Sequence, residues 1–153
     1  MTDVRAVAID LDALGDTRAL WSDWLASARA VLGIEPAVLP TDRGEAAAEL
    51  DRLGAGNWRT LLERYSEERA PVFLRRDAEI SAALRALAAS GHKIGVFTDA
   101  PEPLARVALA QLGAARRASM LETGAGALAR TLAALGANAV VIHSRAELLE
   151  LAT

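Results

Sequence analysis

The chain has 153 residues, a formal net charge of −3 and no cysteine. This length suits a single folding unit with a real core. The slightly acidic balance provides no sustained positive surface for nucleic acid, and the lack of cysteine excludes disulfides, thiolate metal sites and thiol nucleophiles. Apolar residues make up 52% of the sequence and aromatic residues only 4%, so we expect a core built largely from Ala, Leu and Val.

The start of the sequence and its hydropathy bear on location. The first residues run directly into a strand-like stretch, without the basic region and long apolar run of a signal peptide. No stretch approaches the roughly 20 apolar residues of a membrane span. We therefore expect a cytoplasmic protein with no membrane partner, and the abundance of Ala and Arg beside a single lysine suggests a GC-rich bacterial genome.

The first part of the chain predicts one strand followed by helices. The run Val-Arg-Ala-Val-Ala-Ile-Asp-Leu-Asp, residues 4–12, is too short for a helix and rich in β-branched residues, which predicts a buried strand and then a loop up to residue 17. Apolar spacing and capping residues predict three helices, over 18–32, 42–53 and 57–68. We therefore expect residues 18–70 to form a small all-helical insertion.

From residue 77 the pattern changes to alternating helices and strands. The expected helices span 77–90, 101–112, 125–135 and 147–152, and the expected strands span 93–98, 117–121 and 139–142. This alternation implies a parallel sheet with right-handed crossovers. The predicted fold class is α/β, with a core of residues 1–17 and 71–153 that the helical insertion interrupts.

Polar side chains at the ends of two predicted strands form the candidate site. Asp10 and Asp12 end the first strand, and Thr98 and Asp99 end the second. Because the carboxyl ends of parallel strands meet at one edge, these side chains are expected to converge on one crevice. Paired carboxylates can divide nucleophilic attack and proton transfer between them, and a hydroxyl beside a helix N-terminus can bind a phosphate oxygen. The same residue types also cap turns and helices, so that interpretation stays open.

These two stretches resemble the first two motifs of the haloacid dehalogenase (HAD) superfamily. An apolar strand ending in Asp-x-Asp matches residues 7–12, and an apolar strand ending in Thr or Ser matches residues 94–98. The insertion lies where many members carry a small helical cap of the C1 type. The resemblance implies a Rossmann-like HAD core and a phosphatase of a small phosphorylated metabolite. By the same resemblance Asp10 is the nucleophile, Asp12 the general acid and base, and Thr98 with Asp99 binds the substrate.

The third motif of that family departs from its pattern. Its lysine falls on Thr123, and the single lysine, Lys93, begins the second predicted strand and should lie at the wrong end of the sheet. Arg116 or Arg117 could take the place of the missing lysine. A guanidinium differs from an ammonium in size and shape, so this replacement would alter how a phosphate is held.

The fourth motif departs as well. Ser144 stands where an acid is expected, and Glu147 could fill the second acidic position. The resemblance implies that magnesium is held by Asp10, Asp12 and Glu147, but the loss of acids predicts weak binding, because a hard cation needs several oxygen ligands. His143 carries little weight as a metal ligand, since no second residue stands at a matched spacing.

Two functions from different classes follow. The first is a HAD-like phosphatase; the alternative is a catalytically inactive HAD-like protein that acts as a ligand-binding or interaction module. Without a cation, each contact between like charges near Asp10 costs about 4 kcal/mol at an effective dielectric near 20, or roughly three decades of rate, which favours the alternative. A phosphoacceptor receiver domain is disfavoured, because residues 40–70 read as helices. The expected partner is a small phosphorylated molecule, and homodimerisation is left open.

Overall fold

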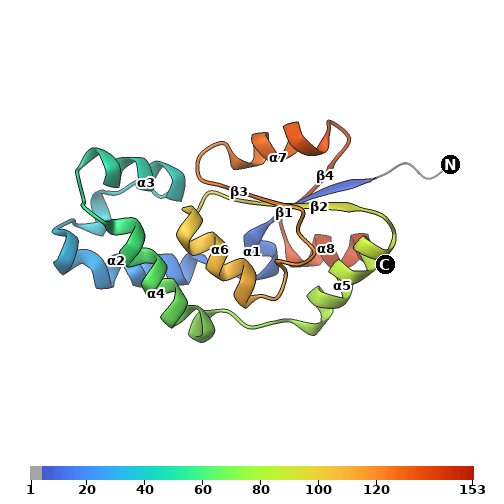
Figure 1. Ribbon diagram of the computed structural model, residues 1–153, viewed down its shortest axis with the longest axis horizontal. Coiled ribbons are helices and arrows are strands. Elements are labelled where there is room, and N and C mark those ends of the chain that lie inside the picture. The colour runs from blue at the N-terminus through green and yellow to red at the C-terminus, as the bar shows by residue number, and fades with distance from the viewer. Residues whose placement is uncertain (1–4) are drawn as a thin grey trace.

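The computed structural model describes residues 5–153, so Val4 of the first predicted strand lies outside the described residues (Figure 1). Four strands form one sheet in the order β3-β2-β1-β4. The strands are β1 (Ala6–Asp10), β2 (Lys93–Thr98), β3 (Met120–Thr123) and β4 (Val140–Ile142). All three pairings are parallel, so the predicted α/β class with a Rossmann-like parallel sheet is confirmed.

The two central strands explain why the sheet forms where it does. Val7, Ala8 and Ile9 of β1 are fully buried, as expected for a parallel strand that is covered on both faces. The register pairs Asp10 with Phe97 and Thr98 with Thr123. The ends of β1, β2 and β3 therefore lie at one edge of the sheet.

Helices cover both faces of this sheet (Figure 1). Helix α7 (Ala127–Leu135) covers one face, and α1 (Leu11–Leu14), α5 (Ala78–Ala89), α6 (Glu102–Gln111) and α8 (Arg145–Ala152) cover the other. Helices α2 (Arg18–Leu32), α3 (Arg43–Arg52) and α4 (Trp58–Phe73), with the short 3-10 helix η1 (Pro36–Val38), gather beyond the strand ends. Within residues 5–153, no helix is both long and apolar enough to cross a membrane.

The three helices beyond the strand ends pack on one another and on the core. Trp24 of α2 stacks at a tilt between Trp21 and Trp58, with ring centroids 5.3 and 6.1 Å apart, and all three rings are buried. Helix α4 packs along α6. The division into an insertion over 18–70 and a core over 1–17 and 71–153 stays a prediction, and α4 itself continues past residue 70 to Phe73.

One predicted loop and one predicted cap in the first half differ from the structure. The expected loop after β1 contains the single helical turn α1, because the Asp10 carboxylate accepts a hydrogen bond from the backbone N–H of Asp12 and caps that turn. Asn57 makes no side-chain capping bond at the start of α4. One turn is too short to produce an apolar periodicity, so hydropathy could not predict α1.

In the second half, β3 and α7 each begin later than predicted. The backbone N–H groups of Arg117 and Ala118 bond back to the carbonyl of Ala114, which makes a turn where a strand was expected. Gly124 and Gly126 adopt left-handed backbone angles, with φ of 78° and 75°, so α7 cannot begin before Ala127.

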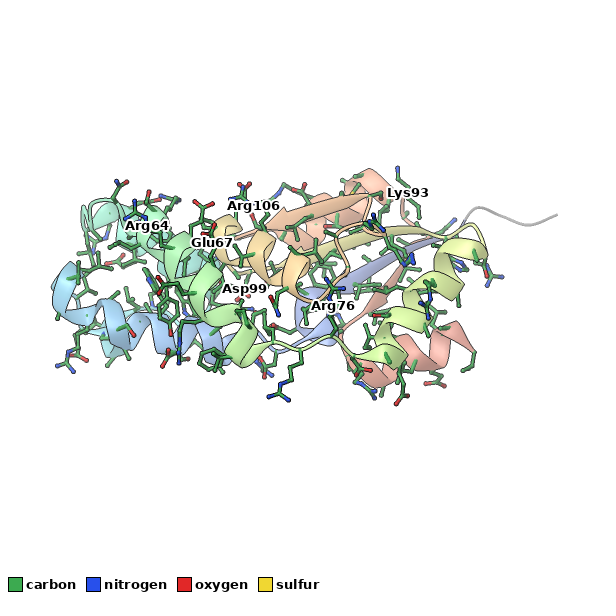
Figure 2. All side chains as sticks on the ribbon, turned by 60° about the horizontal axis from the view of Figure 1, so that its bottom comes forward. Arg64, Glu67, Arg76, Lys93, Asp99 and Arg106 are labelled. Carbon is green, nitrogen blue, oxygen red and sulfur yellow. The ribbon has the colours of Figure 1, made fainter. Side chains whose placement is uncertain are left out.

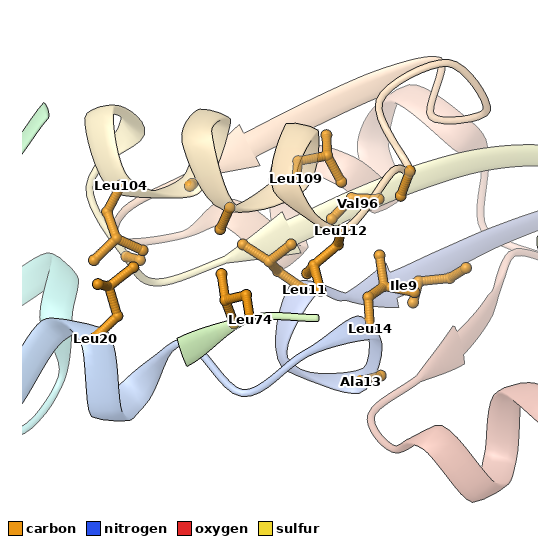
Figure 3. Packing of buried hydrophobic residues seen from close by; sticks show 14 of the residues in the cluster. Ile9, Leu11, Ala13, Leu14, Leu20, Leu74, Val96, Leu104, Leu109 and Leu112 are labelled. Atoms are coloured by element: carbon orange, nitrogen blue, oxygen red, sulfur yellow. The ribbon is translucent and has the colours of Figure 1, made fainter. Parts of the chain in front are cut away.

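Leu104 tests how the outer helices are joined to the core. It is fully buried in α6 and points toward Leu20 of α2 (Figure 3). We expect Leu104→Ala to lower the free energy of unfolding by about 2–5 kcal/mol, measured by urea denaturation, because it leaves a cavity. Val31→Ala, at a site 71% exposed, should change it by less than about 0.5 kcal/mol. Equal effects of the two substitutions would contradict this packing.

Candidate functional site

The end of β1 carries the two acids that the sequence singled out. Asp10 ends the strand, and Asp12 lies on the helical turn that follows it. The second acid therefore does not end an extended strand, yet both carboxylates line the same cavity, as the expected convergence requires. One oxygen of Asp12, Oδ1, accepts hydrogen bonds from the backbone N–H and the hydroxyl of Thr17, at 2.8 and 2.7 Å. Asp12 is thus held firmly by the chain that follows it.

Arg43, at the start of α3, enters this site and was missed by the sequence analysis. Its Nη2 donates to Asp12 Oδ2 at 2.9 Å, and its Nη1 donates to the hydroxyl of Thr17 at 2.6 Å. Its Nε and its backbone N–H donate to the two carboxylate oxygens of Asp99, at 2.9 and 3.0 Å. The guanidinium therefore joins α3 to the segments that follow both central strands.

The local sequence held a signal for Arg43. Asp42 caps α3 by accepting from the backbone N–H of Glu45, which places Arg43 at the first helical position. A positive charge there is unfavourable for the helix dipole, so an arginine at this position needs a partner elsewhere. The glycine that follows, Gly44, is a second signal in the sequence. The structure gives the reason for it: a Cβ at this position would lie 2.5 Å from the backbone nitrogen of Ala125. Helix α3 thus begins in direct contact with the loop after β3.

Thr98 ends β2 and Asp99 follows it, as predicted, and both side chains also accept hydrogen bonds from Arg43. Thr98 is 2% exposed, and its hydroxyl accepts from the backbone N–H of Ala100 at 3.2 Å and from Arg43 Nη2 at 3.4 Å. Asp99 accepts from Arg43, while the N-cap position of α6 belongs to Pro101. The carboxylate of Asp99 therefore serves the contact with α3 rather than capping the start of α6.

A cavity of about 690 Å³ lies between the strand ends and the outer helices. This volume is within the range of small-molecule sites. Charged side chains that line it are Asp10, Asp12, Asp42, Asp99, Arg18 and Arg43, and the loop from Gly124 to Ala127 closes one side. Carboxylates outnumber guanidinium groups in this lining, so the cavity has an acidic character.

The predicted replacements for the third-motif lysine lie at the other edge of the sheet. Lys93 pairs with Ala6 at the start of β1, and Figure 2 shows Lys93 far from Asp99. Arg116 and Arg117 precede β3 and so lie at that same starting edge. The idea that either arginine takes the lysine's place is therefore wrong.

Another arginine does lie beside the third-motif position. Thr123 ends β3, and its carbonyl oxygen and that of Ala125 accept hydrogen bonds from Arg130 of α7. The same guanidinium donates to Glu122 at 2.8 Å. Arg130 therefore fixes the loop that closes the cavity. Its N–H groups donate to neighbouring residues of the chain and so do not face the cavity as lysine replacements.

Of the two residues considered after β4, His143 lies near Asp10, whereas Glu147 bonds to Ser144. His143 Nδ1 lies 3.9 Å from Asp10 Oδ2, and its ring meets Phe97 edge-on. The carboxylate of Glu147 accepts from the Ser144 hydroxyl at 3.1 Å, and its backbone N–H donates to that hydroxyl. Ser144 thus caps the start of α8, and its hydroxyl binds the Glu147 carboxylate locally.

The arrangement does not fit a magnesium ion, which takes about six oxygen ligands, carboxylates among them. Hydrogen bonds occupy Asp10 Oδ1 and both oxygens of Asp12. Over residues 5–153, no three acidic, histidine or cysteine side chains gather where they could hold a metal. Magnesium held by Asp10, Asp12 and Glu147 stays a prediction, and no step below is derived from it.

The electrostatics of the site act on Asp10. Burial raises the pKa of its carboxyl above the ordinary value of 3.8, and the negative charge of Asp12 raises it further. The backbone N–H of Asp12, together with the charges of His143 and Arg43, opposes this rise in the pKa. Asp10 is therefore a carboxyl in a partly dehydrated position, which is typical of a functional group.

Comparison with known proteins identifies the fold. No protein family and no curated protein matches the sequence. The structure is similar to the crystal structure of a putative beta-phosphoglucomutase from Thermotoga maritima, with a TM-score of 0.55 and 17% identity over 97% of this chain and 81% of that chain. Similarity at this identity shows the fold alone, which is a parallel α/β fold with helices on both faces of the sheet.

The raised pKa of Asp10 predicts a gain in stability when its charge is removed. An acid whose pKa rises on folding stabilises the fold below its unfolded pKa, and this contribution is lost as pH rises through the folded pKa. Asn is also a good N-cap residue. We therefore expect Asp10→Asn to unfold at higher urea concentration than the natural protein near neutral pH, with the difference vanishing below the ordinary pKa of 3.8. A less stable variant at neutral pH would contradict this.

Proposed function

We propose that the protein is a HAD-like phosphohydrolase that acts on a small phosphorylated metabolite through Asp10. One observation carries this proposal: Asp10, Asp12 and Thr98, which come from neighbouring strand ends, line one cavity of about 690 Å³. The fold shared with the Thermotoga maritima structure supports the proposal, because that neighbour is named as a putative beta-phosphoglucomutase.

Asp10 has the geometry for nucleophilic attack. Its Oδ1 accepts the backbone N–H of Asp12, and no hydrogen bond within the described chain occupies its Oδ2. Attack by Oδ2 on phosphorus forms an aspartyl-phosphate and breaks the bond to the leaving oxygen, which takes a proton from Asp12. Attack by water on phosphorus, with its proton passing to Asp12, then breaks the bond to Asp10, releases inorganic phosphate and restores both acids. Thr98 and Asp99 are the proposed contacts to the substrate.

The helical insertion over 18–70 is the proposed source of substrate selection. Arg18 and Trp21 of α2 and Thr41 before α3 line the cavity opposite the strand ends. The exposed guanidinium of Arg18 is paired with Asp16 at 2.9 Å, so it lies at the surface end of this lining. A substrate in the cavity would contact these residues with the part that is not transferred.

A second candidate function is the inactive module, in which the cavity binds a ligand without turnover. The specific observation in its favour is that Asp12 accepts three hydrogen bonds, from Thr17 and Arg43. Both oxygens of Asp12 are therefore engaged with the chain itself, and neither is free to face a leaving group. Catalysis therefore requires Arg43 to loosen its contact with Asp12, whereas binding alone does not.

Turnover of p-nitrophenyl phosphate and acetyl phosphate tests the proposal. We expect the natural protein to hydrolyse at least one of them and Asp10→Asn to lose about a hundredfold or more of that rate, because the nucleophile is removed. The matched control is Asp23→Asn, on α2 but outside the cavity lining. Each protein is assayed with added magnesium and with chelator.

The two candidate functions give different outcomes in this assay. Equal rates for the natural protein and Asp10→Asn would reject phosphohydrolase activity on these compounds. The inactive module would then be tested by titrating phosphorylated metabolites against the fluorescence of the tryptophans, since Trp21 lines the cavity. A saturable change in the natural protein that Trp21→Phe reduces would support binding without turnover.

A further inference from the structure

Arg43 is an unusual residue for its place in the fold. It is 4% exposed, and among residues 5–153 it is the one charged residue that is buried. A buried charge is costly unless it is paired and hydrogen-bonded, so its partners define its role. Those partners are the carboxylates of Asp12 and Asp99 and the hydroxyls of Thr17 and Thr98.

We propose that Arg43 is the built-in cation of this site, and that it takes the charge-balancing place that a divalent metal would otherwise fill beside the strand ends. The inference concerns how the site is assembled, so it holds whether the cavity supports turnover or only binding. Arg43 acts through Asp12 and Asp99 and is therefore a positioning residue.

The distances place one cation between two carboxylates. Nη2 of Arg43 lies 2.9 Å from Asp12 Oδ2 and 2.9 Å from Asp99 Oδ1. These two acids come from segments that are 87 positions apart in the chain, and the guanidinium brings them into one ion-pair network. A metal ion near these oxygens would be repelled by the guanidinium and would have to displace its hydrogen bonds.

The backbone of α3 holds the guanidinium in this place. The N–H of Arg43 itself donates to Asp99 Oδ2, so the residue is fixed by its main chain as well as its side chain. Gly44 allows α3 to lie against Ala125, where any side chain would collide with backbone. The start of α3 is therefore held by two contacts, one with Asp99 after β2 and one with Ala125 after β3. These contacts fix the position of the guanidinium.

Removing the charge should expose a latent cation site. In Arg43→Met the side chain keeps much of its length and apolar stem, but Asp12 and Asp99 lose their fixed cation and Asp10 loses a nearby positive charge. Close carboxylates without compensation repel one another, and a divalent cation then relieves that repulsion. Magnesium should therefore stabilise the variant and leave the natural protein unchanged.

Thermal unfolding of the whole chain tests this proposal in chelator, in magnesium chloride and in sodium chloride of the same ionic strength. We expect Arg43→Met to lower the midpoint by roughly 10 °C in chelator, because a buried ion-pair network loses one partner. Magnesium chloride should raise the midpoint of Arg43→Met more than sodium chloride does. For the natural protein the two salts should have the same effect. Arg52→Met is the control, since Arg52 lies at the exposed end of the same helix.

Two further variants keep the proposal open to refutation. Arg43→Lys retains the positive charge but lacks the planar guanidinium. Its unfolding midpoint in chelator should therefore lie between those of the natural protein and Arg43→Met, and magnesium should not raise it. If Arg43→Met does not fold, adding Asp99→Asn should restore folding by removing one uncompensated carboxylate. Failure of that double variant to fold would overturn the charge-balancing role.

One result would overturn the inference directly. If calorimetric titration shows that the natural protein binds magnesium and that Asp10→Asn abolishes the binding, a metal and not Arg43 balances this site. None of these measurements uses turnover, so an inactive protein would leave the role of Arg43 standing, and an active one would not establish it.

Discussion

The ion-pair network of Arg43 with Asp12 and Asp99 is the contact on which the arrangement of the site depends. It joins the first residue of α3 to the segments after β1 and β2, and so sets where the outer helices meet the sheet. Burying the charge of Arg43 is costly, and the network offsets this cost because each N–H group of the guanidinium that faces Asp12, Asp99 or Thr17 has a hydrogen-bond partner. Such a network specifies one position for α3 more strongly than apolar packing alone would.

The parallel sheet explains why these charges meet. Strands β1, β2 and β3 end at one edge, and the polar residues that follow them share that edge. Lys93 lies at the starting edge, as predicted, and so do Arg116 and Arg117, which were considered as replacements for the missing lysine. The cation at the acidic edge instead comes from outside the sheet, from the first residue of α3.

Much of the fold could be predicted because most helices and strands have a local pattern of apolar and polar residues that is typical of their type. The strand over 93–98 and the helix over 18–32 match the structure residue for residue, since a continuous apolar run and an amphipathic repeat with a terminal glycine are strong signals. The turn α1 and the start of β3 were missed because each depends on individual hydrogen bonds within a few residues.

The site was predictable only in part for a related reason. Asp10, Asp12 and Thr98 are visible in the sequence because each ends an apolar strand. Arg43 is separated from Asp99 by 56 positions, and in the sequence it looks like one charge on a polar helix. No periodicity links the two residues. Only the positive charge at a helix start and the glycine after it gave a hint.

Solvent exchange of arginine side-chain protons, measured by nitrogen-15 NMR, tests the central network most directly. The account predicts a distinct, slowly exchanging Nε–H signal for Arg43 that shifts when Asp99 is changed to Asn. The exposed Arg52, paired with Glu49 on the same helix, provides the fast-exchanging reference within the same molecule. A signal from Arg43 that exchanges as fast as that of Arg52 would contradict the buried network and the role assigned to it.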